Sequence, residues 1–305
     1  MHMFTFFENL GTQLIPVKKN ILSATSFCGQ MRNKTLFRAR LLPAISMLIC
    51  LAGCAGLQRD HVQFDRLSDC PKQTAAMLAA KQSQLGPLSD THTLACALIV
   101  LRGTQDPAVL QTSLGSRLCF RLAEREANQD KREKLAAEGV NFAEAALAHG
   151  GGNDGAVHYY LATNLGLAVR EHITLAMENL GRLEAEMKQA VALSPDIDDG
   201  GPLRVLGMLY LKAQSWPNGI GDRDKALELL EKAVKEHPAH PLNHLFYAQA
   251  LWDDGDEAAL SQVKAEFALG KKLLNKGNWG YSKKPWEKEF DEFQQEFGGS
   301  NSVGS

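Results

Sequence analysis

Apolar residues recur every three or four positions along most of the chain after residue 65. In "DKALELLEKAVKEHP", Ala226, Leu230 and Ala233 fall on one side of a helix and charged residues occupy the other. The same part of the chain has no convincing run of alternating β-branched residues, which a strand would show. We therefore predict that residues 66–297 form an all-α domain.

The predicted helices fall into pairs that fit a tetratricopeptide repeat. In such a unit two antiparallel helices pack through small residues, and a proline ends the second helix. Pro238 closes one unit and Pro195 closes the unit before it, with Gly207 and Gly166 as the small residues of the two first helices. In both units the two helices are further apart in sequence than the template requires. This spacing predicts long connections between paired helices.

Three further pairs extend this pattern. A normally spaced pair carries Phe120, Ala123 and Ala127 on one helix and Ala136, Val140 and Ala143 on the other. A looser pair follows in "NHLFYAQALW" and the helix that contains Phe267, and residues 66–103 contain a pair that would cap the array. We predict four or five helical hairpins stacked as a short tetratricopeptide-like solenoid, in which each unit buries its apolar face against its neighbours.

A last amphipathic helix is expected after Pro285. Its apolar stripe consists of Trp286, Phe290, Phe293 and Phe297. We expect this helix to cover the exposed end of the array, and a dimer or trimer contact is the alternative interpretation. Residues 298–305, "GGSNSVGS", are typical of a disordered tail.

Residues 31–53 have the pattern of a bacterial export signal. Four basic residues precede an uncharged apolar stretch, Leu41 to Ala52, that is too short for a comfortable membrane span. The stretch ends in Leu-Ala-Gly-Cys, which resembles the lipobox of bacterial lipoproteins. This resemblance implies that Cys54 is lipidated as the first mature residue and that residues 54–65 form a linker. Residues 1–30 fit no part of a signal of normal length, so we interpret Met31 as the initiator. An unusually long n-region is the alternative.

The expected localisation is the outer membrane of a Gram-negative bacterium, facing the periplasm, because Ala55 rather than Asp follows the cysteine. The whole chain has 33 basic and 35 acidic residues, and residues 1–53 contain six of the basic and one of the acidic residues. Without them the chain has 27 basic and 34 acidic residues and a net charge of −7. Nucleic-acid binding and electrostatic adhesion to anionic lipid both need clustered Lys and Arg. Acyl chains are therefore the expected membrane attachment, and nucleic acid is not an expected partner.

The sequence offers no catalytic or metal-binding pattern. It contains no G-x-S-x-G elbow and no phosphate-binding loop, so we predict a non-enzymatic protein without a cofactor. Cys70, Cys96 and Cys119 allow one disulfide with one thiol left over, or buried free thiols, and no C-x-x-C pair indicates zinc. We interpret the last histidine group as surface residues rather than as metal ligands: His237, His240 and His244.

Four segments, "GNDGAVHYYLATNLG", "DDGGPLRVLG", "SWPNGIGD" and "HPLNH", together resemble the TatT family. These are tetratricopeptide-like lipoproteins associated with tripartite ATP-independent periplasmic (TRAP) transporters. The resemblance covers residues 66–275 and is most specific over 153–245. It implies a lipid-anchored helical body with a pore or cleft, which assembles with a periplasmic solute-binding protein and helps to pass small, hydrophobic ligands to the permease.

Six residues are candidates for the wall of such a cleft. Arg204 could bind an acidic head group, although Asp198, Asp199 or Asp222 could equally be its structural partner. Trp216 could line the cleft or fix its own loop, and Asp222 is expected to cap the next helix. The other four candidates lie on the first helices of three units, where core packing is the alternative: Tyr160, Asn164, Tyr210 and Asn243.

These expectations define two functions. The first is a lipid-anchored periplasmic protein that binds a small hydrophobic or acidic solute, a periplasmic solute-binding protein, or both, within a TRAP-type transport system. The second is an envelope scaffold that binds peptides on its concave face.

Overall fold

The computed structural model describes residues 60–64, 67–215, 217, 219–255 and 257–300. This part of the chain is all-helical, with one isolated bridge between Ser215 and Gly221 and no strand among the described residues, which confirms the all-α prediction. Its α-helices are α2 (Ala75–Ala80), α3 (Thr91–Arg102), α4 (Val109–Arg125), α5 (Gln129–Ala148), α6 (Gly155–Val169), α7 (Ile173–Leu193), α8 (Gly201–Lys212), α9 (Arg223–Glu236), α10 (Pro241–Asp254), α11 (Leu260–Lys276) and α12 (Lys283–Ser300).

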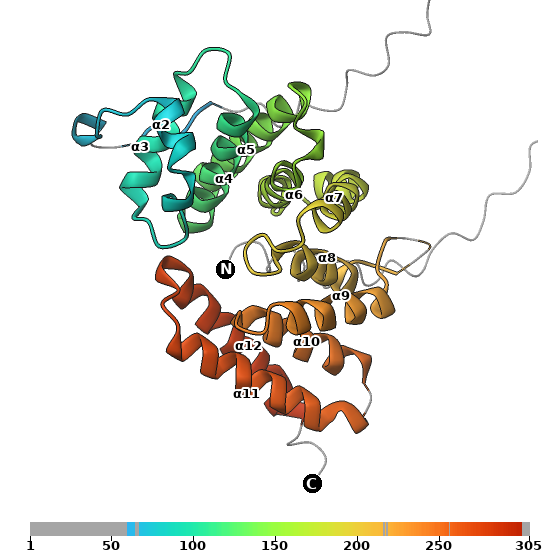
Figure 1. Ribbon diagram of the computed structural model, residues 1–305. Coiled ribbons are helices and arrows are strands. Elements are labelled where there is room, and N and C mark those ends of the chain that lie inside the picture. Colours follow the sequence, from blue (N-terminus) through green and yellow to red (C-terminus); the bar gives the residue numbers. More distant parts are fainter. Residues whose placement is uncertain (1–59, 65–66, 216, 218, 256, 301–305) are drawn as a thin grey trace, which may run out of the picture.

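From α4 to α11 each helix packs against the next one in the chain (Figure 1). Side chains define where three of these helices begin, because Asn128, Asp154 and Asp222 each accept a backbone N–H of the helix that follows. The predicted capping role of Asp222 is thereby confirmed. None of the helices described is long and apolar enough to cross a bilayer.

The second helices of two hairpins carry the predicted buried stripes. In α9 the buried residues are Ala226, Leu230 and Ala233, and in α7 they include Leu183, Met187 and Ala190. Gly207 of α8 lies directly against α9, because a Cβ there would be 2.7 Å from Leu230 Cγ. Gly166 of α6 does not have this role, since a Cβ there would meet Leu183 Cδ2 only at 3.8 Å.

Long connections occur in one of the two units for which they were predicted. Residues 213–222 separate α8 from α9, whereas only residues 170–172 separate α6 from α7. The prediction for the α6–α7 unit was therefore wrong. The additional residues of that unit extend its two helices instead of forming a loop.

Three hairpins fix the entry to their first helix in the same way. The fourth residue of α6, α8 and α10 contacts the carbonyl oxygen six positions before it. These contacts join His158 Nε2 to Gly152 at 2.9 Å, Arg204 Nη2 to Asp198 at 3.1 Å, and His244 Nε2 to Pro238 at 2.8 Å. A repeated hydrogen bond at one position of successive hairpins indicates an internal structural repeat.

His244 and His240 are buried, so interpreting them as surface histidines was wrong. The His244 ring lies between two acceptors, with Nδ1 at 2.6 Å from Glu266 Oε2 and Nε2 facing the Pro238 carbonyl. Burial opposes protonation, but the hydrogen bonds to Glu266 and Pro238 and the Glu266 charge outweigh it and raise the pKa of His244 above its ordinary value of 6.5.

The His244–Glu266 pair should make stability depend on pH. Because the folded-state pKa is raised, the protonated ring stabilises the fold fully below pH 6.5, and this contribution is lost as the pH rises through the folded-state pKa. We expect Glu266→Gln to cost about 1.5–3 kcal/mol at low pH and less at higher pH. Urea unfolding of both proteins at pH values below and above 6.5 measures the difference in their free energies of unfolding. Asp130→Asn, which removes an exposed pair with Lys134, should show no such trend.

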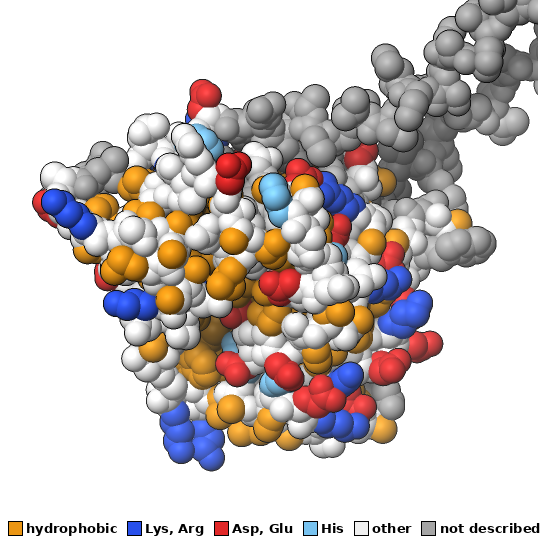
Figure 2. Space-filling model, turned by 45° about the horizontal axis from the view of Figure 1, so that its top comes forward, with side chains coloured by type: hydrophobic (Ala, Val, Ile, Leu, Met, Phe, Trp, Pro, Cys, Tyr) orange, Lys and Arg blue, Asp and Glu red, His pale blue; other side chains and the backbone are white. Residues whose placement is uncertain are grey.

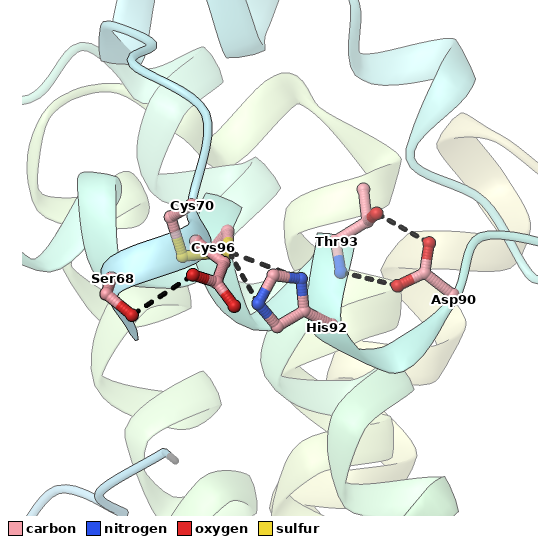
Figure 3. Close-up of a disulfide and its surroundings, with 7 residues drawn as sticks. Ser68, Cys70, Asp90, His92, Thr93 and Cys96 are labelled. Carbon is pink, nitrogen blue, oxygen red and sulfur yellow. Dashed lines mark hydrogen bonds between the residues drawn. A yellow bond between two sulfur atoms is a disulfide. The ribbon is translucent and has the colours of Figure 1, made fainter. Parts of the chain in front are cut away.

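A disulfide between Cys70 and Cys96 joins the segment before α2 to α3, and Cys119 is free and buried (Figure 3). One bridge with one thiol left over is one of the arrangements that the sequence allowed. The bridge connects residues 26 positions apart. It therefore restrains the N-terminal elements, of which α2 has only six residues.

The helix α12 covers the end of the array, as predicted. Phe290 and Phe293 are 0% and 2% exposed, and Trp286 and Phe297 pack against the same core. The helix begins two residues before Pro285 and continues to Ser300, beyond the expected boundary at 297. Residues 301–305 of the predicted tail lie outside the described residues.

The two ends of the described fold also meet. Arg125, the last residue of α4, donates hydrogen bonds to the carbonyls of Pro87 and Ser89, and its guanidinium lies 4.1 Å from the centre of the Tyr281 ring. Leu88 and Gly280 are close enough that a Cβ on Gly280 would lie 3.0 Å from a Leu88 methyl carbon. The helical array therefore curves until the segment after α2 contacts the segment before α12 (Figure 1).

Candidate ligand-binding cavity

A cavity of about 290 Å³ lies where the curved array closes. Its wall combines side chains from α4, α6, α8 and α10, the turn before α8, the loop after α2 and the tail around α12: Pro87, Leu88, Phe120, Arg121, Glu124, Tyr159, Asp198, Asp199, Arg204, His240, Leu242, Asn278, Trp279, Ser282 and Trp286. Figure 2 shows a face that is hollowed near its centre, with hydrophobic side chains in the hollow and acidic side chains beside it. The volume lies at the small end of the range for ligand pockets.

The turn before α8 forms one wall in an unusual backbone conformation. Asp198, Asp199 and Gly200 all have positive φ, at 50°, 52° and 82°. Gly200 also lies against His237, because a Cβ there would be 2.7 Å from His237 Cδ2. Left-handed non-glycine residues carry strain that the surrounding structure must hold in place, and they are enriched at functional sites.

Arg204 holds this turn in place. Its Nη1 donates to Asn243 Oδ1 at 2.6 Å and to the Asp199 carbonyl at 3.2 Å, and its Nη2 donates to the Asp198 carbonyl. The predicted carboxylate partner is thus replaced by backbone carbonyls and an amide. Burial lowers the pKa of Arg204, against the opposing charges of Tyr159, Asp198 and Asp199. Arg204 is only 5% exposed and is one of the residues that line the cavity.

Arg121 is the second buried guanidinium of the wall. It pairs with Asp198 Oδ1 at 2.5 Å and with Glu124 Oε2 at 3.4 Å. Burial acts to lower the pKa of Arg121, but the charges of Asp198, Tyr160, Glu124 and Tyr159 together outweigh it and raise the pKa above the ordinary value. Arg121 therefore stays charged, and carboxylates balance its charge.

Aromatic rings form another part of the wall. The His240 ring lies edge-on to Trp279 and Trp286, with ring centres 5.5 and 5.0 Å apart. Burial, followed by the charges of Arg204 and Arg121, lowers the pKa of His240 well below its ordinary value, so this ring is neutral. The cavity thus has a charged side and an apolar, aromatic side, an arrangement suited to a small amphipathic molecule.

Of the five predicted cleft residues that the structure describes, only Arg204 lines this cavity. Tyr160 and Asn243 lie behind the wall, where the Tyr160 hydroxyl is 3.5 Å from Asp198 Oδ2 and Asn243 Nδ2 donates to the carbonyls of Ala233, His237 and Asp199. Both residues support the wall instead of facing its interior.

Asn164 and Tyr210 are directed elsewhere. Asn164 is fully buried and donates to the Ser116 carbonyl, the Ser116 hydroxyl and the Tyr160 carbonyl, which is the packing role left open by the sequence. The Tyr210 hydroxyl donates to Glu184 Oε1 at 2.7 Å. Trp216 and the proposed lipidation residue Cys54 lie outside the described residues.

Sequence reasoning did not find Arg121, Trp279 or Trp286 as cavity residues. Trp286 was expected in the tail helix, but as part of a cover. Arg121 had a detectable signal, because an arginine in the apolar stretch "LCFRLA" requires either exposure or a partner. Its partner, Asp198, is far away in sequence, so only the folded chain reveals the pair.

One group of side chains outside the cavity has metal-ligand chemistry. The donor atoms of Cys70, His92 and Cys96 lie within 4.8 Å of one another. Both sulfurs belong to the disulfide and are not thiolates, and Figure 3 shows the His92 ring beside the bridge. This group therefore contributes a structural link in the state described.

No protein-family model matches the chain, and no curated protein matches it in sequence. The function is therefore argued from the geometry of the cavity and from the motifs of the sequence.

Proposed function

We propose that this chain is a lipid-anchored periplasmic protein with a tetratricopeptide-like solenoid, which binds a small hydrophobic or acidic solute as part of a TRAP-type transport system. The anchoring depends on the Leu-Ala-Gly-Cys sequence that ends at Cys54, and the transport partner depends on the resemblance to the TatT family. The repeated contact at His158, Arg204 and His244 supports the solenoid.

The observation that carries the binding role is the cavity of about 290 Å³ with both polar and aromatic walls. Trp279, Trp286 and Leu242 offer apolar surface, while Arg204 offers guanidinium donors at the other side. A solute with an apolar body and an acceptor group would remove apolar surface from water and satisfy a buried charge at the same time.

Ligand binding by the full chain, purified in detergent, tests this role. We expect one or more compounds from a panel of small carboxylic acids and apolar molecules to raise the melting temperature. Trp286→Ala should weaken that binding at least tenfold, because it removes part of the aromatic wall. The matched control is Trp252→Ala, since Trp252 packs on Phe297 and is not a cavity residue.

The absence of any stabilising compound, or equal loss of binding in both tryptophan variants, would contradict the proposal. The partner is tested separately by purifying the lipidated protein from its own envelope and identifying co-purifying chains by mass spectrometry. Recovery of a TRAP solute-binding subunit is the expected result, and recovery of envelope-assembly factors alone would favour the peptide-binding scaffold.

A further inference from the structure

Two opposite charges at the cavity wall lack an ionic partner in contact. The first is Arg204, whose hydrogen bonds all go to uncharged oxygens, namely two backbone carbonyls and the Asn243 amide. The second is Asp199, which is exposed and whose carboxylate has no hydrogen bond or ion pair among the residues that the structure describes. The other wall charges differ, because Arg121 is paired with both Asp198 and Glu124.

Arg204, which lacks an ionic partner in contact, also fixes the position of the Asp199 backbone. Arg204 binds the backbone carbonyl of Asp199 at 3.2 Å, and Asn243 Nδ2 binds that carbonyl at 3.1 Å. The backbone at Asp199 is held at a φ of 52°. Asp199 and Arg204 are thereby held next to each other along one wall of the cavity, although their side chains do not form a salt bridge with each other.

We propose that the cavity binds a zwitterion of the α-amino-acid class with an apolar side chain. The carboxylate of the ligand faces Arg204, its ammonium group faces Asp199, and its side chain lies against Trp279, Trp286 and Leu242. A ligand with both charges compensates both unpaired groups, whereas a simple acid leaves the Asp199 carboxylate beside a second negative charge. This inference depends on the proposed binding function and specifies its substrate class.

Calorimetry with the full chain in detergent tests the ligand class. The probes are L-leucine and L-phenylalanine, each compared with its deaminated acid (4-methylpentanoate or 3-phenylpropionate) and its decarboxylated amine (3-methylbutylamine or 2-phenylethylamine). We expect at least one amino acid to bind at least tenfold more tightly than both of its analogues, because each analogue lacks one of the two charges.

Asp199→Asn identifies the ammonium contact. Asn keeps the size of the side chain and tolerates a left-handed backbone, so the variant should fold. We expect its affinity for the amino acid to fall at least tenfold, while its affinity for the deaminated acid stays equal or rises. The matched control is Asp196→Asn in the same turn, because Asp196 is exposed, contacts His237 and does not line the cavity.

The outcomes separate this inference from the proposed function. Tighter binding of a deaminated acid or an amine than of its parent amino acid would overturn the zwitterion and leave solute binding intact. Equal loss in Asp199→Asn and Asp196→Asn would overturn the Asp199 contact. If none of these six compounds binds, the inference fails, and the proposed function fails with it only when the wider panel also gives no stabilisation.

Discussion

Phe290→Ala is expected to lower the free energy of unfolding by about 3–5 kcal/mol and to weaken ligand binding. Phe290 is fully buried, its ring centre lies 5.6 Å from that of Phe267, and its ring tip would be 2.9 Å from a Cβ on Gly270. Truncation leaves a void between α12 and α11 that neither helix can fill. Trp286 lies one turn earlier on α12, so loosening this helix also disturbs the aromatic wall of the cavity.

Urea unfolding followed by tryptophan fluorescence measures the loss, and calorimetry with the tightest ligand measures the effect on binding. Lys284→Ala on the same helix is the control, because Lys284 is exposed and a surface substitution should change stability by less than about 0.5 kcal/mol. A loss of less than about 1 kcal/mol in Phe290→Ala would show that α12 does not depend on this contact.

Gly139→Ala is expected to destabilise the protein by about 3 kcal/mol or more, an unusually large effect for one added methyl group. A Cβ at Gly139 would be 2.4 Å from the amide atoms of Asn164. To make room, Asn164 must leave its hydrogen bonds to Ser116 and Tyr160, all of which are buried. The cost thus combines overpacking with unsatisfied polar groups.

A second glycine in a helix provides the matched control. Gly181 in α7 is exposed and has no atom within 4 Å of where its Cβ would be. Gly181→Ala should therefore stabilise the protein by up to about 1 kcal/mol through helix propensity alone. Denaturant unfolding of both variants measures the change in the free energy of unfolding. Similar changes in the two would mean that Asn164 can move away from the added methyl group without destabilising the protein.

The helices were predictable because burial repeats with the helical period. Ala226, Leu230 and Ala233 could be placed on a buried stripe from sequence alone, and the structure confirms it. The length of a connection was less predictable, since extra residues can lengthen helices as well as loops. Residues 170–172 show the first case and residues 213–222 show the second.

The cavity could not be predicted from the same pattern. It forms where the loop at Leu88, the turn at Asp199 and the helix at Trp286 meet, and this depends on the curvature accumulated over several hairpins. The period of apolar residues places a residue on one face of its own helix but does not predict how strongly the array of helices curves. Tyr210 illustrates the error, because it is on a first helix as expected and yet its hydroxyl contacts Glu184 of α7.

The left-handed turn was also only partly predictable. Gly200 adopts a positive φ readily because it has no Cβ, but the positive φ values extend back to Asp198 and Asp199. These values exist because Arg204 and Asn243 bind the carbonyls of the turn. A local sequence cannot show such support when one of its members, Asn243, belongs to the next hairpin.

The contact between Arg125 and Tyr281 has a consequence for how the fold comes apart. An open stack of hairpins frays separately at each end, because each unit touches only its neighbours. Here the loop after α2 and the segment before α12 touch, so whichever end melts first removes a supporting surface from the other. Unfolding at one end of the array is therefore expected to destabilise the other end.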